Sequence, residues 1–93
     1  MIRLNCFFEV LPGHADEVLK LAKELVAASL NDKGCKGYDL FVSATRPDVM
    51  MFCETWACEE CLREHSESEH FRRLVPAIES HTKNGLKLEK FIS

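Results

Sequence analysis

The chain has 93 residues, of which 46% are hydrophobic and 29% charged, with 12 Lys and Arg against 15 Asp and Glu. This balance is typical of one globular domain over residues 1–93 and excludes a disordered chain. The net charge of −3, without any basic cluster, argues against a nucleic-acid partner. No apolar run approaches the roughly 20 residues of a membrane helix, and the N-terminal residues lack a signal-peptide layout. We therefore expect a cytoplasmic protein without membrane contact.

The first third of the chain predicts a strand followed by a helix. Apolar and other residues alternate along residues 2–10, which is typical of a strand with one strongly apolar face. After Pro12-Gly13, apolar positions at helical spacing predict a helix over residues 14–31. Gly34 and Gly37 are expected to bracket the turn that follows.

The remainder predicts three strands and a helical region in two parts. Residues 38–44 and 49–56 are the second and third strands, and the third is the most apolar, so we expect it in the centre of the sheet. Helical segments follow, interrupted at residues 66–68, with a kink or a helix start expected near Pro76 because proline lacks the backbone N–H. These helical segments cover residues 57–65 and 69–82, and the fourth strand covers residues 86–92.

The element order β-α-β-β-α-β predicts an α+β, ferredoxin-like fold, with a four-stranded antiparallel sheet and the helices on one face. The strands over 2–10 and 49–56 carry Phe or Met on both faces. The face without helices would therefore expose a large apolar patch, which monomers rarely do. Packing sheet against sheet in a two-fold homodimer would cover it, so we expect a homodimer.

One stretch carries a family resemblance. Residues 54–71 contain Glu54-Thr55-Trp56, then Cys61-Leu62, His65 and His70-Phe71. Together with Pro12-Gly13 and Gly34-Cys35-Lys36-Gly37-Tyr38, this stretch resembles the antibiotic biosynthesis monooxygenase (ABM) family, over nearly the whole chain and in the same order. The resemblance implies a dimeric α+β barrel.

The activity implied by the resemblance is oxidation of a quinol-like or phenolic small molecule with O₂ and no cofactor, metal or flavin. Other relatives isomerise small phosphorylated diones, and one branch degrades haem. The haem branch needs a Trp where this chain has His65 and a His where it has Val75, and its strand Asn aligns with Cys6. Haem degradation is therefore disfavoured.

Two histidines are the catalytic candidates. His65 lies beside Leu62 on an amphipathic segment, and a histidine suits a base at neutral pH that converts a phenol into the anion that reduces O₂. A structural histidine is the alternative. His70 follows at a spacing that does not share a face of one continuous helix, but the interruption at 66–68 would let the rings converge. Two histidines without a carboxylate at good spacing make a poor zinc set, so no metal is expected.

Six further residues are candidates for substrate contact, each with a structural alternative. Asn5 could donate to a substrate oxygen, or contact water or a partner. Trp56 could stack on an aromatic substrate, although packing beneath the next helix is favoured, and Glu54 on the same strand face would orient a His or Arg. The full set is Asn5, Phe7, Tyr38, Glu54, Trp56 and Arg72, with core packing the alternative for Tyr38 and a solvated face for Arg72. His14 and His81, near helix ends, are expected to be exposed.

The five cysteines are an odd number, which does not favour a disulfide framework. Cys58-x-x-Cys61 is the one close pair, half of a zinc site or a redox dithiol in its functional interpretation. No second such pair exists, and the surroundings do not resemble a thioredoxin motif, so an inert pair is favoured.

Two further functions stay open beside the monooxygenase. An isomerase of a small phosphorylated dione would need a cation such as Arg72 or Arg73 in its pocket. A non-catalytic, dimeric ligand-binding protein of the same fold would be favoured if Phe and Met side chains filled the pocket.

Overall fold

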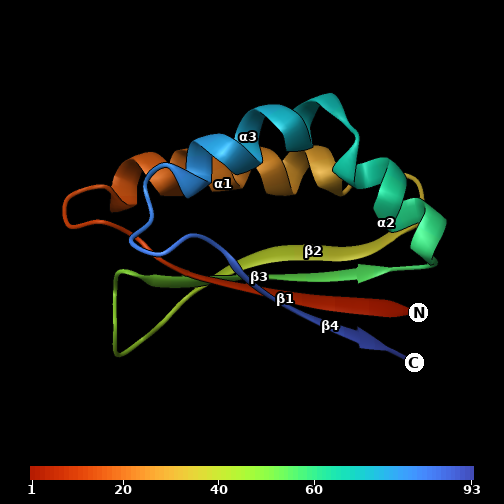
Figure 1. Cartoon of the computed structure of the whole chain (residues 1–93), viewed down its shortest axis with the longest axis horizontal. Helices are drawn as coiled ribbons and strands as arrows, with labels where there is room; N and C mark the ends of the chain where they lie inside the picture. Colours follow the sequence, from red (N-terminus) through yellow and green to blue (C-terminus); the bar gives the residue numbers. More distant parts are fainter.

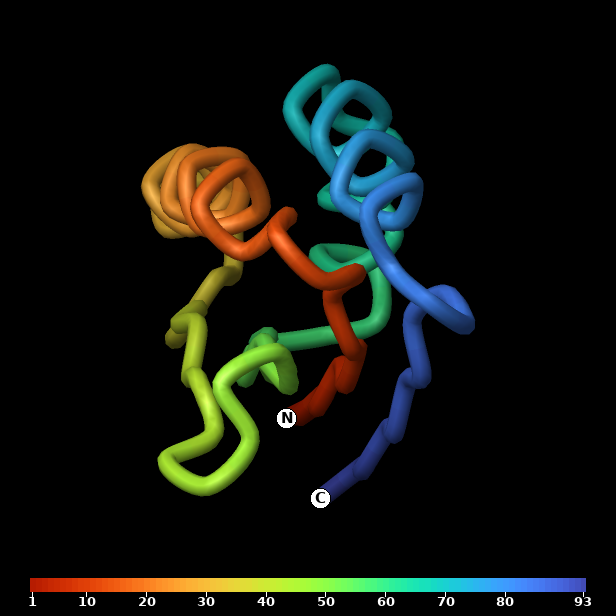
Figure 2. Tube along the Cα trace, turned by 90° about the vertical axis from the view of Figure 1, so that its left-hand side faces the viewer, coloured from red at the N-terminus to blue at the C-terminus, as the bar shows by residue number.

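The computed structural model describes residues 1–93, and it consists of one antiparallel sheet covered on one face by helices (Figure 1). Viewed nearly along the helix axes, α1 and α3 lie side by side above the strands (Figure 2). The elements in chain order are β1 (Ile2–Glu9), α1 (Ala15–Ser29), β2 (Cys35–Val42), β3 (Val49–Trp56), α2 (Glu59–Ser66), α3 (Glu69–Glu79) and β4 (Lys87–Ile92).

The sheet has the strand order β2-β3-β1-β4, with every neighbouring pair antiparallel. This is the predicted ferredoxin-like α+β topology. The expectation that the third strand is central is also confirmed, because β3 lies between β2 and β1. No helix is long and apolar enough to cross a membrane.

The core lies between the helices and one face of β1 and β3. Burial alternates along both strands, so that Leu4, Phe8 and Phe52 are buried while their sequence neighbours are partly or fully exposed. Helix α1 contributes Leu25 and α3 contributes Ile78, both fully buried. Burying a large apolar side chain contributes about 1.5–3 kcal/mol, and this alternation fixes which strand face meets the helices.

Two local predictions were wrong. Gly34, with φ of 78°, forms the turn before β2, whereas Gly37 lies within β2 beside a register irregularity between Cys35 and Gly37. β2 therefore begins at Cys35, three residues earlier than predicted. Helix α3 begins at Glu69 and runs through Pro76, so the expected helix start near this proline is wrong, whereas the alternative of a kink stays a prediction. The missing N–H leaves one helical carbonyl without its usual partner.

The second face of the sheet carries no helices and has a row of large apolar side chains at its centre. Phe7, Met51 and Phe41 lie side by side in register across β1, β3 and β2. The two phenylalanines are 38% and 50% exposed. At the edge of the sheet, every residue of β4 is exposed.

Candidate functional site

A mostly apolar pocket of about 350 Å³ lies between the α2–α3 region and the helix-covered face of the sheet. Eleven of its fifteen lining residues are hydrophobic. Its polar groups come from Tyr38, Glu54, His65, Ser66 and Lys90. The volume is at the lower end for ligand pockets, and the lining suits a small apolar or aromatic molecule.

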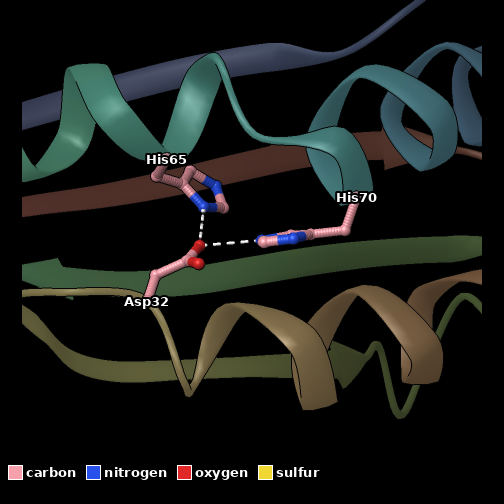
Figure 3. Close-up of side chains that lie close together, drawn as sticks. All are labelled: Asp32, His65 and His70. Atoms are coloured by element: carbon pink, nitrogen blue, oxygen red, sulfur yellow. Dashed lines mark hydrogen bonds and ion pairs between the residues drawn. The ribbon is translucent and has the colours of Figure 1, made fainter.

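His65 and His70 converge on one carboxylate, that of Asp32 (Figure 3). The Nδ1 atom of His65 lies 2.7 Å from Oδ2 of Asp32, and the Nε2 atom of His70 lies 2.8 Å from the same oxygen. An ionised carboxylate offers only acceptors, so both of these ring nitrogens carry a proton and donate it. A neutral His65 therefore has its lone pair on Nε2.

Local structure explains why the two rings meet. Helix α2 ends at Ser66, and Ser68 caps α3 by accepting the Phe71 backbone N–H at 3.2 Å. The Ser68 hydroxyl also donates to the His65 carbonyl at 2.7 Å, which fixes the break between the helices. The chain thus changes direction between α2 and α3, at the Ser68 cap, and this brings the His65 and His70 rings together as expected.

Asp32 is positioned by the tight turn between α1 and β2. Its backbone N–H donates to the Ser29 carbonyl at 3.0 Å, and its carbonyl accepts from Cys35 at 3.1 Å. Asp32 was not predicted as a site residue, because an Asp in a turn before glycine is ordinary turn chemistry. The available signal was a carboxylate in that turn, but no spacing rule relates it to histidines 33 and 38 residues away.

His65 is buried and has one free ring nitrogen. The residue is 2% exposed, and its Nε2 atom has no hydrogen-bond partner. The ring lies against Trp56, with 4.5 Å between ring centroids, and against Phe71 at 5.2 Å. Burial lowers the pKa of His65 below its ordinary value, and the Asp32 carboxylate opposes this shift. At neutral pH the imidazole is therefore uncharged and able to accept a proton.

Glu54 belongs to a second polar group. Its Oε1 accepts the Trp56 indole N–H at 3.0 Å, and the Tyr38 side chain lies nearby. Burial raises the pKa of Glu54, and the contacts with Trp56 and Tyr38 oppose the shift. The expectation that Glu54 orients a His or Arg is therefore corrected, because its hydrogen-bond donor is Trp56. Trp56 is fully buried beneath the helices and does not line the pocket.

The other predicted contacts lie outside the pocket. Asn5 and Phe7 are on the sheet face without helices, where the Asn5 side-chain oxygen accepts from the Cys53 thiol at 3.4 Å. Arg72 is exposed on α3 and does not line the pocket. Of the six predicted substrate contacts, the structure brings only Tyr38 and Glu54 to the pocket.

His14 and His81 are not exposed as expected. They are partly buried, and their Nδ1 atoms lie 2.8 Å apart. The pair joins the loop before α1 to the segment after α3.

Asp32, His65 and His70 also provide enough ligand atoms for a possible metal site. Asp32, His65 and His70 offer one carboxylate oxygen and two imidazole nitrogens, all within 4.8 Å of one another. Such a set can hold Zn²⁺ or Fe²⁺. No metal was expected because the two histidines had no carboxylate at good spacing in the sequence, and Asp32 provides that carboxylate. An ion bound by His65 Nδ1 would put the ring proton on Nε2. Metal binding and base chemistry at His65 therefore exclude each other.

The fold is thus a ferredoxin-like α+β sheet with an apolar pocket, and the buried His65 belongs to the lining of that pocket. Residues 1–77 match the profile of the family described as Antibiotic biosynthesis monooxygenase (ABM), and the chain belongs to this family. The resemblance noted in the sequence is confirmed.

Individual relatives agree with this assignment. "Putative monooxygenase YcnE" of Bacillus subtilis (strain 168) is 32% identical over 75 residues, which cover 81% of this chain and 79% of YcnE. A conserved protein of unknown function from Bacteroides thetaiotaomicron, described as a "Possible Oxidoreductase", is 44% identical with a TM-score of 0.91, covering 97% of this chain and 94% of that one. A crystal structure of an antibiotic biosynthesis monooxygenase is 32% identical with a TM-score of 0.94, covering 100% and 98%.

Proposed function

We propose that this protein is a monooxygenase that oxidises a quinol-like or phenolic small molecule with O₂, using His65 as general base and no bound cofactor. The observation that carries the proposal is the His65 ring, which belongs to the lining of an apolar pocket, with Nδ1 held by Asp32 and a buried Nε2 that has no hydrogen-bond partner. The name of the relative YcnE supports the reaction class.

In the proposed reaction, His65 removes the proton that makes a phenol a poor reductant. Nε2 accepts the proton of the substrate hydroxyl, and the Asp32 carboxylate, 2.7 Å from Nδ1, stabilises the imidazolium that forms. The resulting anion transfers electrons to O₂. A quinol balances the reaction alone, because one oxygen atom enters the ring, the other leaves as water, and the product is a hydroxyquinone.

The apolar lining contributes to this step in two ways. It gives a flat ring a surface to pack against, and it excludes the water that would otherwise solvate the anion and weaken the pull of nearby charges. Tyr38 and Glu54 stand in the same wall and offer polar contacts for the substrate's second oxygen.

A homodimer is part of the proposal. The row of Phe7, Met51 and Phe41 on the helix-free face supports pairing of two sheets, because these apolar side chains otherwise stay partly exposed to water. Phe41→Glu is expected to convert a dimer into a monomer in analytical ultracentrifugation. Val42→Glu is the matched control, since Val42 is similarly exposed, at 47%, but points to the other face of β2. A monomeric wild-type chain would contradict the dimer.

The alternative functions receive less support. A phosphorylated dione needs a cation in the pocket, and Lys90, the one Lys or Arg in the lining, is paired with Glu59 at 2.9 Å. Arg72 is outside the pocket, and Arg73 pairs with Glu24 and Glu69 on the surface. A binding protein with a pocket filled by its own side chains is disfavoured by the open volume of about 350 Å³.

The test is O₂ consumption by metal-stripped protein with a panel of quinols and polycyclic phenols. We expect uptake above autoxidation, and a loss of about 10²- to 10⁴-fold in His65→Gln, the usual contribution of a general base. His14→Gln is the matched control, because it changes a histidine outside the pocket. No uptake with any substrate, or full activity in His65→Gln, would refute the proposal. Activity only after adding Fe²⁺ or Zn²⁺ would favour the metal site instead.

A further inference from the structure

Two thiols face each other at the start of α2. Cys58 is the N-cap residue of this helix, and its sulfur accepts the Cys61 backbone N–H at 3.4 Å. The two Sγ atoms lie 2.8 Å apart and are not bonded. A disulfide requires about 2.05 Å between the sulfurs, so the pair needs to close by less than about 1 Å.

The two sulfurs differ in access and acidity. Cys58 is exposed, whereas Cys61 is 6% exposed. The hydrogen bonds that Cys58 accepts from the thiol and backbone of Cys61 lower the pKa of Cys58, and the same contact raises the pKa of Cys61. A helix N-terminus further favours a thiolate. An exposed nucleophile beside a buried thiol is the arrangement of an attacking and a resolving cysteine.

Cys61 also touches the turn that carries Asp32. A Cβ atom at Gly34 would overlap the Cys61 side chain, so the sulfur packs directly on the glycine. The Gly34 carbonyl in turn accepts the Ala57 backbone N–H at 2.8 Å, which ties the turn to the segment before α2. On the helix, Cys61 precedes His65 by one turn, and both are buried. The Cys61 sulfur is therefore linked to Asp32 through the turn at Gly34 and to His65 through helix α2.

We propose that Cys58 and Cys61 form a reversible redox pair, oxidised to a disulfide by hydroperoxides, and that the disulfide alters the Asp32–His65 contact through Gly34. The Cys58 thiolate attacks the O–O bond of the hydroperoxide, an S–O bond forms, and the alcohol (or water, from H₂O₂) leaves with a proton. Cys61 then loses its proton and attacks the sulfur of the sulfenic acid. The S–S bond forms and water leaves. The two thiols have lost two electrons to the hydroperoxide, and a dithiol reductant returns them.

The first measurement is the covalent state of the full chain after brief treatment with a small excess of H₂O₂. We expect a mass loss of two hydrogens, two fewer alkylatable thiols, peptide mapping to Cys58 and Cys61, and full reversal by dithiothreitol. Cys61→Ser should stop at the sulfenic acid on Cys58, and Cys58→Ser should form no intramolecular disulfide. Cys53→Ser, which removes a thiol on the other sheet face, should behave as wild type. Five thiols surviving treatment, or oxidation centred on another cysteine, would overturn the redox pair.

The second measurement tests the link to the site without any substrate. Trp56 is the single tryptophan, and its ring lies 4.5 Å from that of His65, so its fluorescence reports on this environment. Oxidation should change Trp56 emission in wild type and Cys53→Ser, but not in Cys58→Ser. Unchanged emission after disulfide formation would overturn the coupling. An accompanying change in turnover rests on the proposed function, whereas both measurements above stand even if the oxygenase proposal fails.

Discussion

Replacing Asp32 by Asn tests whether this carboxylate controls His65. Asn keeps the shape of the side chain but removes the charge that accepts both ring protons, at 2.7 and 2.8 Å. If the amide oxygen takes the place of Oδ2, the His65 tautomer is kept but the imidazolium loses its counter-charge. If the amide NH₂ faces Nδ1 instead, the ring proton moves to Nε2 and the base is lost.

The size of the effect follows from these two cases. A hydrogen bond to a charged group contributes about 1.5–3 kcal/mol. At about 1.36 kcal/mol for each tenfold change, losing only the charge predicts a decrease in kcat/KM of about 10- to 150-fold. Loss of the tautomer would bring the decrease toward the full contribution of a general base, about 10⁴-fold.

The pH dependence gives a second, independent readout. Asp32 raises the pKa of His65 against the larger, opposite effect of burial. Without the charge the pKa of His65 falls further, so the acid limb of kcat/KM should move to lower pH while the plateau decreases. The assay is O₂ uptake across the pH range, with urea unfolding to confirm the fold and Asp16→Asn, on the exposed first turn of α1, as the matched control. An unchanged plateau, or an acid limb that moves to higher pH, would refute this reasoning.

Three predictions concern stability, all measured by urea unfolding. Gly34→Ala should destabilise the fold by about 1–3 kcal/mol more than Gly13→Ala. Both glycines have positive φ, but only a Cβ at Gly34 meets Cys61. Equal losses of stability in the two variants would contradict the close packing of Cys61 on Gly34. Trp56→Phe should lower the free energy of unfolding by about 1–3 kcal/mol, because it leaves the buried Glu54 carboxylate without its indole donor. Tyr38→Phe should act in the same direction. An unchanged free energy of unfolding in Trp56→Phe would mean that Glu54 finds another partner. Burial lowers the pKa of His65, so the unfolded chain binds a proton near pH 6.5 that the folded chain does not. The free energy of unfolding is therefore not reduced by this effect above that pH, and it decreases as the pH falls below it. The difference in the free energy of unfolding between pH 7.5 and 5.5 should be smaller in His65→Gln than in the wild type. An equal difference would show that another group is responsible.

The fold was predictable because its signals are local. Alternation along β1 and β3 and helical spacing in α1 depend on neighbouring residues, and they gave the correct topology. Alternation does not say which face the helices cover when both faces carry Phe or Met. For this reason Asn5 and Phe7 were expected at the substrate, although they lie on the other side of the sheet.

The site was predictable only in part. His65 and His70 are close in sequence, and the serines between them signalled the change of direction that brings the rings together. Asp32 approaches them through the turn between α1 and β2, a contact that depends on the packing of three separate elements. Glu54 was recognised as a buried acid that needs partners, but which donors reach it depends on side-chain positions that alternation does not specify.

The edge position of β4 has a consequence for how the pocket exchanges its contents. This strand pairs with β1 alone, and all its side chains are exposed, so little apolar burial opposes its detachment. Yet Leu88 and Lys90 on β4 form part of the pocket wall. The pocket is thus closed on one side by a strand that we expect to open more easily than the central strands β1 and β3. Hydrogen exchange at the β4 amides should be faster than at β1 or β3, should slow when the pocket is occupied, and would measure directly the opening of this pocket wall.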